Sequence, residues 1–527
     1  MSTFYRPTDG VAADFIPLHW KGNYHLFYLK DYRDEAGHGE GTPWFQVVTK
    51  DFVNFDDWGE MLPRGPKDSQ DVWVFTGSAI ERQGTFHIFY TGHNSHFYNT
   101  EKPVQQVMHA TSPDLCTWTK NPEFMFRAPG ELYEKDDWRD PFVFWNADAN
   151  EYWMLLAARR KAVIPGRNRG CTALAVSPDL QTWRVAEPFW APDEYFTHEC
   201  PDLFRIGDWY YLVYSTFTER CVTHYRMSRS LAGPWLCPPN DTFDGRAFYA
   251  AKTAGETDGR HVIEPERAEV GTAAVRSEDS VLLAEGEEPA EEAREQPGAA
   301  RRRRFVFGWL PTRKDQKDDG SWEWGGNLVV HQIAQHLDGT LSVHVPDGVL
   351  APFATKLQLQ PKPFLGEWKI KKNAISAAAV GRFSALTLGT MPGECLVETA
   401  VKFKKWTQSC GLLLRAGKRT QQAASLHTDD KLDSCYQVRL EPANQRMVID
   451  RWPRPGDQPF MLERPLAMKP GKPVALQVFV EGSCLVVYAN HQVALSCRMY
   501  DHPGGSLGLF VAEGEASFSG TTIRTRE

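Results

Sequence analysis

One pattern recurs along the first three-fifths of the chain: a short, aromatic-rich apolar run of strand length, bounded by turn residues. The runs are "YHLFYL" at Tyr24, "FHIFYT" at Phe86, "YWMLLAA" at Tyr152, "WYYLVYS" at Trp209 and "RFVFGWL" at Arg304. A second run and a tight turn precede each of the first four, so each pair is expected to form a β-hairpin. A single hairpin cannot bury its apolar face alone, so such a repeat favours an arrangement in which neighbouring units pack together.

A second element follows three of the hairpins. It reads "TKDFVNFDDW" from Thr49, "TSPDLCTWTK" from Thr111 and "VSPDLQTWRV" from Val176, with "SRSLAGPW" from Ser228 as a degenerate fourth copy. A Ser/Thr/Asp turn followed by an aromatic residue is typical of a corner between an inner and an outer strand. Four-stranded blades with long loops fit this spacing, and five blades close a ring. We therefore expect an all-β chain that begins with a five-bladed β-propeller over residues 1–345.

The gap before the fifth run holds a segment of unusual composition. Residues 264–300 are rich in Glu, Ala and Pro and poor in aromatics, and they are followed by four consecutive Arg residues. Such a segment cannot bury enough apolar surface to order itself, so we expect a mobile insert in the fifth blade. The basic run could mark a nucleic-acid patch, but the acidic tract beside it and the net charge of −8 favour a solvated loop.

The hairpin repeat ends after about residue 345. From residue 364 onward come alternating strands such as "CLVETAVKF", "PVALQVFV" and "SCLVVYAN", separated by Gly, Pro and Asn turns. Regularly spaced short strands of this kind predict a β-sandwich over residues 364–527, with residues 346–363 as the linker.

Composition narrows the class of protein. Hydrophobic residues make up 42% and charged residues 24% of the chain, as in an ordinary globular protein. There is no apolar run of transmembrane length, and the N-terminus lacks the pattern of a signal peptide. The ten cysteines are scattered without metal-type pairs. These features predict a cytoplasmic protein that binds no metal, membrane or nucleic acid; the oligomeric state stays open.

Three acidic residues precede the aromatic runs at similar distances. Asp14 lies ten residues before Tyr24, Glu199 ten before Trp209, and Asp140 twelve before Tyr152, while Thr76 stands at the matching place in the second unit. In a propeller the innermost strands line one channel, so the acids are expected to occupy equivalent positions and to converge on its mouth. An Asp before Pro, as at Asp140, is also a common turn residue, but like charges brought together are hard to explain by packing.

Paired carboxylates across a cleft are the requirement of glycoside cleavage. One carboxyl group protonates the leaving oxygen, and the other attacks the sugar or activates water. Glu199, beside His198 and several aromatics, suits the proton donor if partial desolvation raises its pKa. Asp14 is then left as the nucleophile, and Asp140 can stabilise a cationic transition state.

Several blocks of the sequence resemble those of glycoside hydrolase family 32, the β-fructofuranosidases. The blocks are "ADFIPLHWKGNYHLFYL", "WVFTGSAI", "WRDPFVF", "ECPDLF", "RRRFVFGWLPT", "WEWGGNLVVHQIAQHLDGTLSVHVP" and "LQVFVEGSCLVVYANHQVALSCRMY". The resemblance spans nearly the whole chain, and it implies a five-bladed propeller followed by a β-sandwich. It also implies cleavage of β-fructofuranosidic linkages, with no cofactor and a small carbohydrate as the substrate.

The resemblance assigns roles to individual residues. Asp14 is the nucleophile, Asp140 the transition-state stabiliser and Glu199 the acid/base. The substrate-binding residues that it implies are Arg139, Trp44, Trp73, Phe75 and Thr76, and His198 is added because it adjoins Glu199.

The first block departs from the family pattern. Ala13 and Ile16 stand where the family usually has Asn, and Leu29 replaces a frequent Gln. Gly482 and Val487 also depart from the usual sandwich block. We therefore expect a divergent member that acts by hydrolysis or transfer on a fructan, fructo-oligosaccharide or difructose rather than on sucrose. The alternatives are an inverting arabinofuranoside-type propeller glycosidase and a sugar-binding protein without activity.

Overall fold

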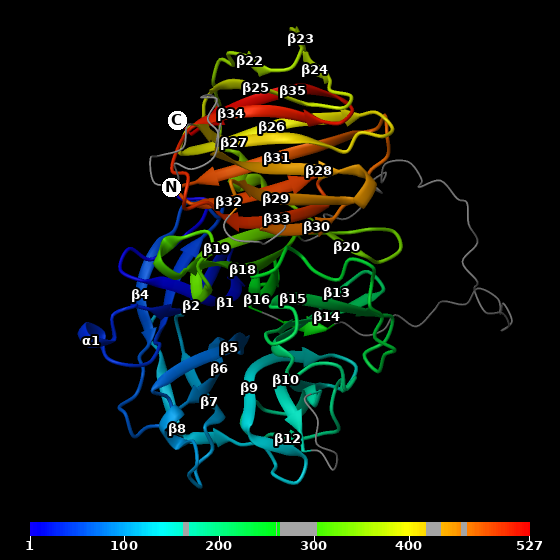
Figure 1. Ribbon diagram of the computed structural model, residues 1–527. Coiled ribbons are helices and arrows are strands. Elements are labelled where there is room, and N and C mark those ends of the chain that lie inside the picture. The colour runs from blue at the N-terminus through cyan, green and yellow to red at the C-terminus, as the bar shows by residue number, and fades with distance from the viewer. Residues whose placement is uncertain (162–167, 260, 264–302, 418–433, 455–460, 527) are drawn as a thin grey trace, which may run out of the picture.

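The computed structural model describes residues 1–161, 168–259, 261–263, 303–417, 434–454 and 461–526. These residues form an all-β molecule in two stacked parts (Figure 1). The insert predicted for residues 264–300 lies outside the described residues. Among the helices described, none combines the length and the apolar character needed to cross a membrane.

In its described residues, the first part contains twenty strands and one four-residue helix at its edge. The elements are β1 (Val11–Trp20), β2 (Asn23–Asp31), α1 (Glu35–His38), β3 (Trp44–Thr49), β4 (Asp56–Leu62), β5 (Trp73–Arg82), β6 (Thr85–His93), β7 (Gln105–Ser112), β8 (Thr119–Phe126), β9 (Tyr133–Asn146), β10 (Glu151–Arg160), β11 (Gly170–Ser177), β12 (Arg184–Val185), β13 (Glu199–Ile206), β14 (Trp209–Thr216), β15 (Val222–Ser228), β16 (Tyr249–Gly255), β17 (Val262–Ile263), β18 (Arg304–Arg313), β19 (Trp322–Gln335) and β20 (Leu341–His344). Short 3-10 turns lie at Ser95–Phe97 and Lys314–Gln316.

Antiparallel pairing confirms the four predicted hairpins. They are β1–β2, β5–β6, β9–β10 and β13–β14, and each continues outward in sequence order. The fifth aromatic run is β18, which pairs with β16 on one side and β19 on the other. The N-terminal β1 joins β19 through the pair Ala12↔Gly326, so the chain's first strand shares a sheet with its last strands of this part.

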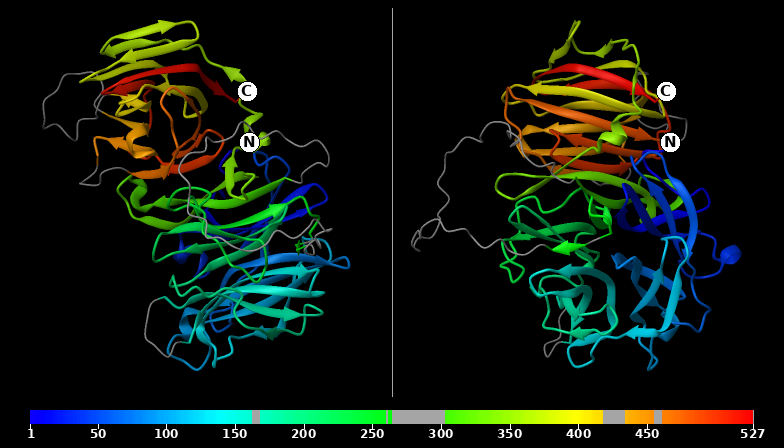
Figure 2. Two further views of the ribbon diagram at one scale, coloured as in Figure 1. Left: turned by 90° about the vertical axis from the view of Figure 1, so that its right-hand side faces the viewer. Right: turned by 180° about the vertical axis from the view of Figure 1, so that it is seen from behind.

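The first strands of successive sheets form a closed cycle. β1 contacts β5, β5 contacts β9, β9 contacts β13, β13 contacts β16, and β16 contacts β1. Figures 1 and 2 show the sheets arranged around a common centre. This arrangement brings residues from distant parts of the sequence to one end of the cycle.

The second repeated element forms the same corner three times. The hydroxyl oxygens of Thr49, Ser112 and Ser177 each accept a backbone N–H from three residues onward, at 2.9 Å. Those donors, Phe52, Leu115 and Leu180, have left-handed φ values of 63°, 66° and 67°. The predicted turn is therefore confirmed, but it joins the third strand of each unit to the outermost one (β3 to β4, β7 to β8 and β11 to β12) rather than an inner strand to an outer one.

The second part consists of two sheets. Its elements are α2 (Asp347–Leu350), β21 (Thr355–Lys356), β22 (Lys362–Leu365), β23 (Trp368–Lys371), β24 (Ala374–Ala378), β25 (Phe383–Thr390), β26 (Glu394–Phe403), β27 (Ser409–Gly417), β28 (Ser434–Glu441), a 3-10 turn at Pro442–Asn444, β29 (Arg446–Trp452), β30 (Leu462–Pro465), β31 (Pro473–Glu481), β32 (Cys484–Ala489), β33 (Val493–Arg498), β34 (Ser506–Ala512) and β35 (Glu515–Thr525).

The two sheets enclose one apolar core. One sheet has the order β23-β24-β35-β26-β31-β32-β33, and the other β22-β25-β34-β27-β28-β29-β30. Side chains from both sheets share a single buried cluster. β21, within the predicted linker 346–363, pairs with β35, so part of that linker lies in the sandwich sheet.

A buried polar network joins the two parts. Asp244 accepts a hydrogen bond from the backbone N–H of Ser496 at 2.8 Å, and its Oδ2 lies 3.0 Å from His331 Nε2. Nδ1 of the same His331 lies 2.8 Å from the hydroxyl of Tyr488. Burial of polar groups is tolerated where they are mutually hydrogen-bonded, so this network links the first part to the sandwich without exposing either core.

Candidate active site

Each of the five central strands carries a β-bulge at the same end. The register shifts begin at Asp14, Thr76, Asp140, Cys200 and Ala250. Four of these residues have a positive φ: 47° for Asp14, 59° for Asp140, 50° for Cys200 and 48° for Ala250. Bulges at strand ends re-aim side chains and often lie next to active sites.

This register corrects one prediction. The bulge residue of β13 is Cys200, so Asp14, Asp140 and Cys200 are equivalent. Glu199 stands one position earlier and matches Arg139 of β9 and Tyr249 of β16. The expectation that the three acids occupy equivalent positions is therefore wrong for Glu199, because the counts began at non-equivalent residues. Trp209 belongs to the first pair of its hairpin, whereas Tyr24 follows the first pair of its own by one residue.

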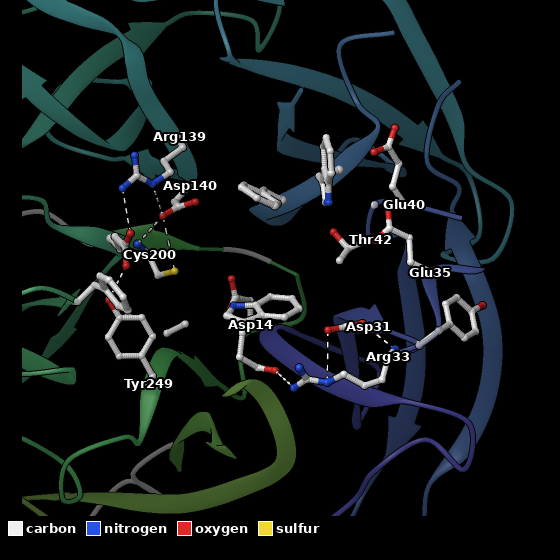
Figure 3. A pocket seen from close by; sticks show the side chains of 18 of the residues that line it. Asp14, Asp31, Arg33, Glu35, Glu40, Thr42, Arg139, Asp140, Cys200 and Tyr249 are labelled. Carbon is white, nitrogen blue, oxygen red and sulfur yellow. Dashed lines mark hydrogen bonds and ion pairs between the residues drawn. The ribbon is translucent and has the colours of Figure 1, made fainter. Parts of the chain in front are cut away.

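The bulges surround a cavity of about 720 Å³ at the end of the central strands (Figure 3). Six of the residues predicted for the site line it: Asp14, Trp73, Phe75, Arg139, Asp140 and Glu199. The lining residues that were not predicted include Tyr249, Trp324 and the largely exposed Phe217. The cavity also has a polar wall from the connection between β2 and β3.

Asp14 is held by two neutral donors. Thr76 Oγ1 donates to its Oδ2 at 2.9 Å, and the indole N–H of Trp309 donates to its Oδ1 at 3.1 Å. Thr76 thus supports Asp14 from behind and does not line the cavity. Burial, with the nearby Asp140 carboxylate, raises the pKa of Asp14 to about 7, against the action of both hydrogen bonds.

Asp140 is the more deeply buried carboxylate. Its Oδ2 accepts the backbone N–H of Cys200 at 2.9 Å and lies 3.8 Å from Arg139 Nε. Its own backbone N–H donates to Thr91 at 2.8 Å, which fixes the bulge. Burial raises the pKa of Asp140, and the guanidinium of Arg139 opposes that effect.

Glu199 has a charged partner and a phenolic one. Arg139 Nη2 donates to its Oε1 at 2.9 Å, and the hydroxyl of Tyr249 donates to its Oε2. Arg139 Nη1 also donates to Asp137 at 2.9 Å. The surroundings expected for Glu199, His198 and aromatics, are thus replaced by a guanidinium and a phenol.

Besides Thr76, two further predicted substrate-binding residues do not reach the cavity. Trp44 is fully buried, and its indole N–H donates to the carbonyl of Phe75 at 3.1 Å, so it supports the cavity wall from behind. His198 is also fully buried and packs against Trp190 and Tyr214. His198 directly precedes β13, and its ring turns into the core rather than toward the cavity.

Tyr249 and Trp309 were missed by sequence reasoning. They pair with each other on β16 and β18, which are separated in the sequence by β17 and residues 264–302. Tyr249 directly precedes the stretch "AAK", in which the β-bulge of β16 begins. Residues directly before the bulges of other central strands line the cavity, so this position is the signal that could have identified Tyr249.

The residues that replace the family's amides are buried. Ala13 lies in one apolar cluster, and Ile16 and Leu29 lie in another. In the sandwich, Gly482 has a φ of 56° in the turn between β31 and β32, and Val487 is fully buried in the core. None of these five positions lines the cavity.

Known proteins resemble this chain in sequence. Residues 13–265 match the family described as "Glycosyl hydrolases family 32 N-terminal domain". A sucrose-6-phosphate hydrolase of Escherichia coli is 22% identical over 534 residues, which covers 98% of this chain and 93% of that protein. A levanbiose-producing levanase of Bacillus subtilis is 26% identical over 250 residues, 46% of this chain and 43% of that protein. The levanase match therefore spans less than half the length of that relative.

Solved structures resemble the whole molecule. Fructan 1-exohydrolase IIa from Cichorium intybus has a TM-score of 0.68 at 16% identity and covers 99% of this chain and 96% of its own. Sucrose-6-phosphate hydrolase from Lactobacillus gasseri has a TM-score of 0.67 at 15% identity and covers 100% of this chain and 93% of its own. These likenesses extend through both parts, a β-propeller followed by a β-sandwich. Residues 13–265, nearly half of the chain, thus carry the N-terminal domain of glycoside hydrolase family 32, and the solved structures extend the likeness of fold to both parts.

Proposed function

We propose that this protein is a retaining glycosidase that cleaves β-fructofuranosidic linkages by double displacement, by hydrolysis or by transfer. The observation that carries the proposal is the different setting of two carboxyl groups in one cavity. Asp14 is held by the neutral donors Thr76 and Trp309, whereas Glu199 is held by Arg139 and Tyr249. Pairs of carboxyl groups in unlike surroundings are typical of acid/base and nucleophile roles.

In this mechanism, Asp14 attacks the anomeric carbon while the bond to the leaving oxygen breaks. Glu199 gives its proton to that oxygen, and a covalent fructosyl-enzyme forms. Glu199 then takes a proton from water or from an acceptor sugar, whose oxygen displaces Asp14. Asp140, fixed by the Cys200 N–H, stabilises the positive charge that develops on the ring.

The propeller proposed here has five blades. The closed cycle of contacts among β1, β5, β9, β13 and β16 supports this number, as do the five bulges at one end of the cycle. The last blade would combine β16, β18, β19 and β20, joined to the first through β1 and β19. The division into a propeller domain over residues 1–345 and a β-sandwich domain over residues 364–527 is part of the same proposal.

Matched variants test the roles of the two acids. Asp14→Asn and Glu199→Ala should each lose several orders of magnitude in kcat and keep the fold by circular dichroism. Azide should restore turnover of an activated fructofuranoside by Glu199→Ala, because the intermediate forms but lacks its base. Asp14→Asn should show no such rescue. Rescue of Asp14→Asn alone would reverse the assignment, and binding of sugars without turnover by the unmodified protein would indicate a sugar-binding protein.

A further inference from the structure

The cavity is strongly acidic. Its lining holds seven carboxylates against two guanidinium groups, and no lysine is among the described lining residues. The acids are Asp14, Asp31, Asp34, Glu35, Glu40, Asp140 and Glu199, and the cations are Arg33 and Arg139. Three of the acids belong to the proposed chemistry, and the other four need a separate explanation.

The four further acids come from one segment, the connection that leaves β2 and leads to β3. We call Asp31, Asp34, Glu35 and Glu40 the acidic wall. In Figure 3 the labelled members lie on the opposite side of Asp14 from Arg139 and Asp140. A substrate held at Asp14 therefore lies between two groups of carboxylates.

Both cations already have anionic partners. Arg33 Nε lies 3.4 Å from Asp31, and its Nη2 donates to Thr312 at 3.3 Å and to the carbonyl of Trp324. Arg139 is paired with Asp137 and Glu199, both at 2.9 Å. A phosphate group would therefore have to compete with these carboxylates to bind either guanidinium group.

The neighbouring histidines and helix provide no phosphate site of their own. His96 Nε2 lies 2.8 Å from Glu40, and His38 stacks on Tyr32 with ring centroids 4.0 Å apart. The first turn of α1 is capped by the Asp34 carboxylate, which accepts the Gly37 N–H at 3.0 Å. His96 and the first turn of α1 therefore already face carboxylates, and His38 is stacked on a phenol ring.

From this arrangement we infer that the site selects uncharged fructosides and rejects their phosphate esters. A phosphate monoester carries a charge of about −1.5 to −2 at pH 7 and calls for arginine or lysine partners. A cleft lined by one sign of charge concentrates the potential and excludes ligands of the same sign. Neutral sugars meet no such barrier, since their hydroxyl groups can donate hydrogen bonds to the wall. The inference rests on the proposed function and separates this chain from relatives named sucrose-6-phosphate hydrolases.

Substrates that differ only in a phosphate test the inference. We expect kcat/KM for sucrose to exceed that for sucrose 6-phosphate at least tenfold at pH 7.5 and low salt. If cleavage of sucrose is too slow to measure, inhibition provides the same comparison. Fructose should then inhibit cleavage of the best fructoside more strongly than fructose 6-phosphate does. Equal or better use of the phosphate ester would overturn the inference and leave the proposed function standing. If no fructoside is cleaved, the proposed function fails, and calorimetric binding of the same pairs still decides the charge preference.

A charge-matched pair of variants identifies the source of the preference. Glu35→Gln combined with Glu40→Gln removes two charges from the acidic wall. Asp208→Asn combined with Glu394→Gln removes two from exposed sites remote from the cavity, whose side chains are 77% and 57% exposed. The wall variant should lower the preference for the neutral member at least threefold, and the remote variant should leave it unchanged. The single variant Glu35→Gln, at an exposed position, is tested separately, so that a folding defect caused by Glu40→Gln can be recognised. An unchanged preference in both wall variants would contradict the role of the wall.

Discussion

The indole N–H of Trp309 donates a hydrogen bond to Oδ1 of Asp14 at 3.1 Å, across 295 residues of sequence. Trp309 lies on β18 and Asp14 on β1, so this bond connects strands from the two ends of the propeller chain. The closure of the strand cycle therefore also determines the surroundings of the proposed nucleophile.

Trp309→Phe keeps an aromatic ring but removes this donor. The hydrogen bond lowers the pKa of Asp14, so its loss should raise that pKa further and favour the neutral acid. We expect kcat/KM to fall about tenfold at pH 6 and less at pH 9, consistent with one lost hydrogen bond to a charged group. The control is Trp118→Phe, which removes an indole hydrogen bond to the Leu115 carbonyl, outside the cavity lining. A loss of activity that is the same at every pH would indicate a packing defect instead.

The activity should have an acidic limb near neutrality. Asp14 must be ionised to attack, and its pKa is raised to about 7 in the free enzyme. The measurement is kcat/KM against pH, which reports on the free enzyme and should fall about tenfold per pH unit below that value. A profile that is flat down to pH 5 would show that Asp14 is not the group that must lose its proton.

Stability should respond to the same titration with a defined sign. The pKa of Asp14 is higher in the folded protein than its ordinary value of about 3.9, so the folded state binds the proton first as pH falls. The ionised side chain therefore destabilises the fold above pH 7, and this cost disappears as the pH drops toward 4. Relative to the parent, Asp14→Asn should gain about 2–4 kcal/mol in unfolding free energy between pH 4.5 and pH 8. Calorimetry at several pH values measures this gain, and the control Asp208→Asn, at an exposed position, should show none. A difference in unfolding free energy between Asp14→Asn and the parent that stays constant from pH 4.5 to pH 8 would refute the raised pKa.

Sucrose should be a poor substrate compared with another fructofuranoside. Ala13, Ile16 and Leu29 are buried in apolar clusters and offer no side-chain hydrogen bonds where the family usually has amides. Each lost bond is worth about 1–3 kcal/mol if its partner stays unpaired, so we expect at least a tenfold deficit in kcat/KM. Chromatography of products from sucrose, inulin, levan and difructose anhydrides is the measurement. Sucrose as the best of this panel would contradict the expectation.

The predictable features of this fold were the local ones. The aromatic hairpins and the Ser/Thr corners follow from patterns within ten to twenty residues, and the pairing confirms them. The role of β16 as the first strand of the last sheet was harder to predict, because a long segment of sequence separates it from its pairing partner β18. Tyr249 and its contact with Glu199 were missed for that reason.

Within the site, the carboxylates were easier to predict than their partners. Asp14, Asp140 and Glu199 were found because acids before apolar strands are unusual. The bulges were not found, and the pairing register places Glu199 one position away from the other two acids. Trp44 was misplaced because adjacent strand residues face opposite sides, and the sequence pattern did not reveal which side faces the cavity. His198 was misplaced because it precedes β13 and its ring turns into the core.

The stereochemistry of the first-formed product tests the central claim most directly. Carbon-13 NMR of a β-fructofuranoside labelled at its anomeric C2, recorded within minutes of adding enzyme, follows the anomer released before mutarotation. If Asp14 forms a covalent intermediate and Glu199 acts as acid and then base, the first product has the β configuration. Release of the α anomer would show a single displacement by water and contradict the role assigned to Asp14, even if every Asp14 variant were inactive.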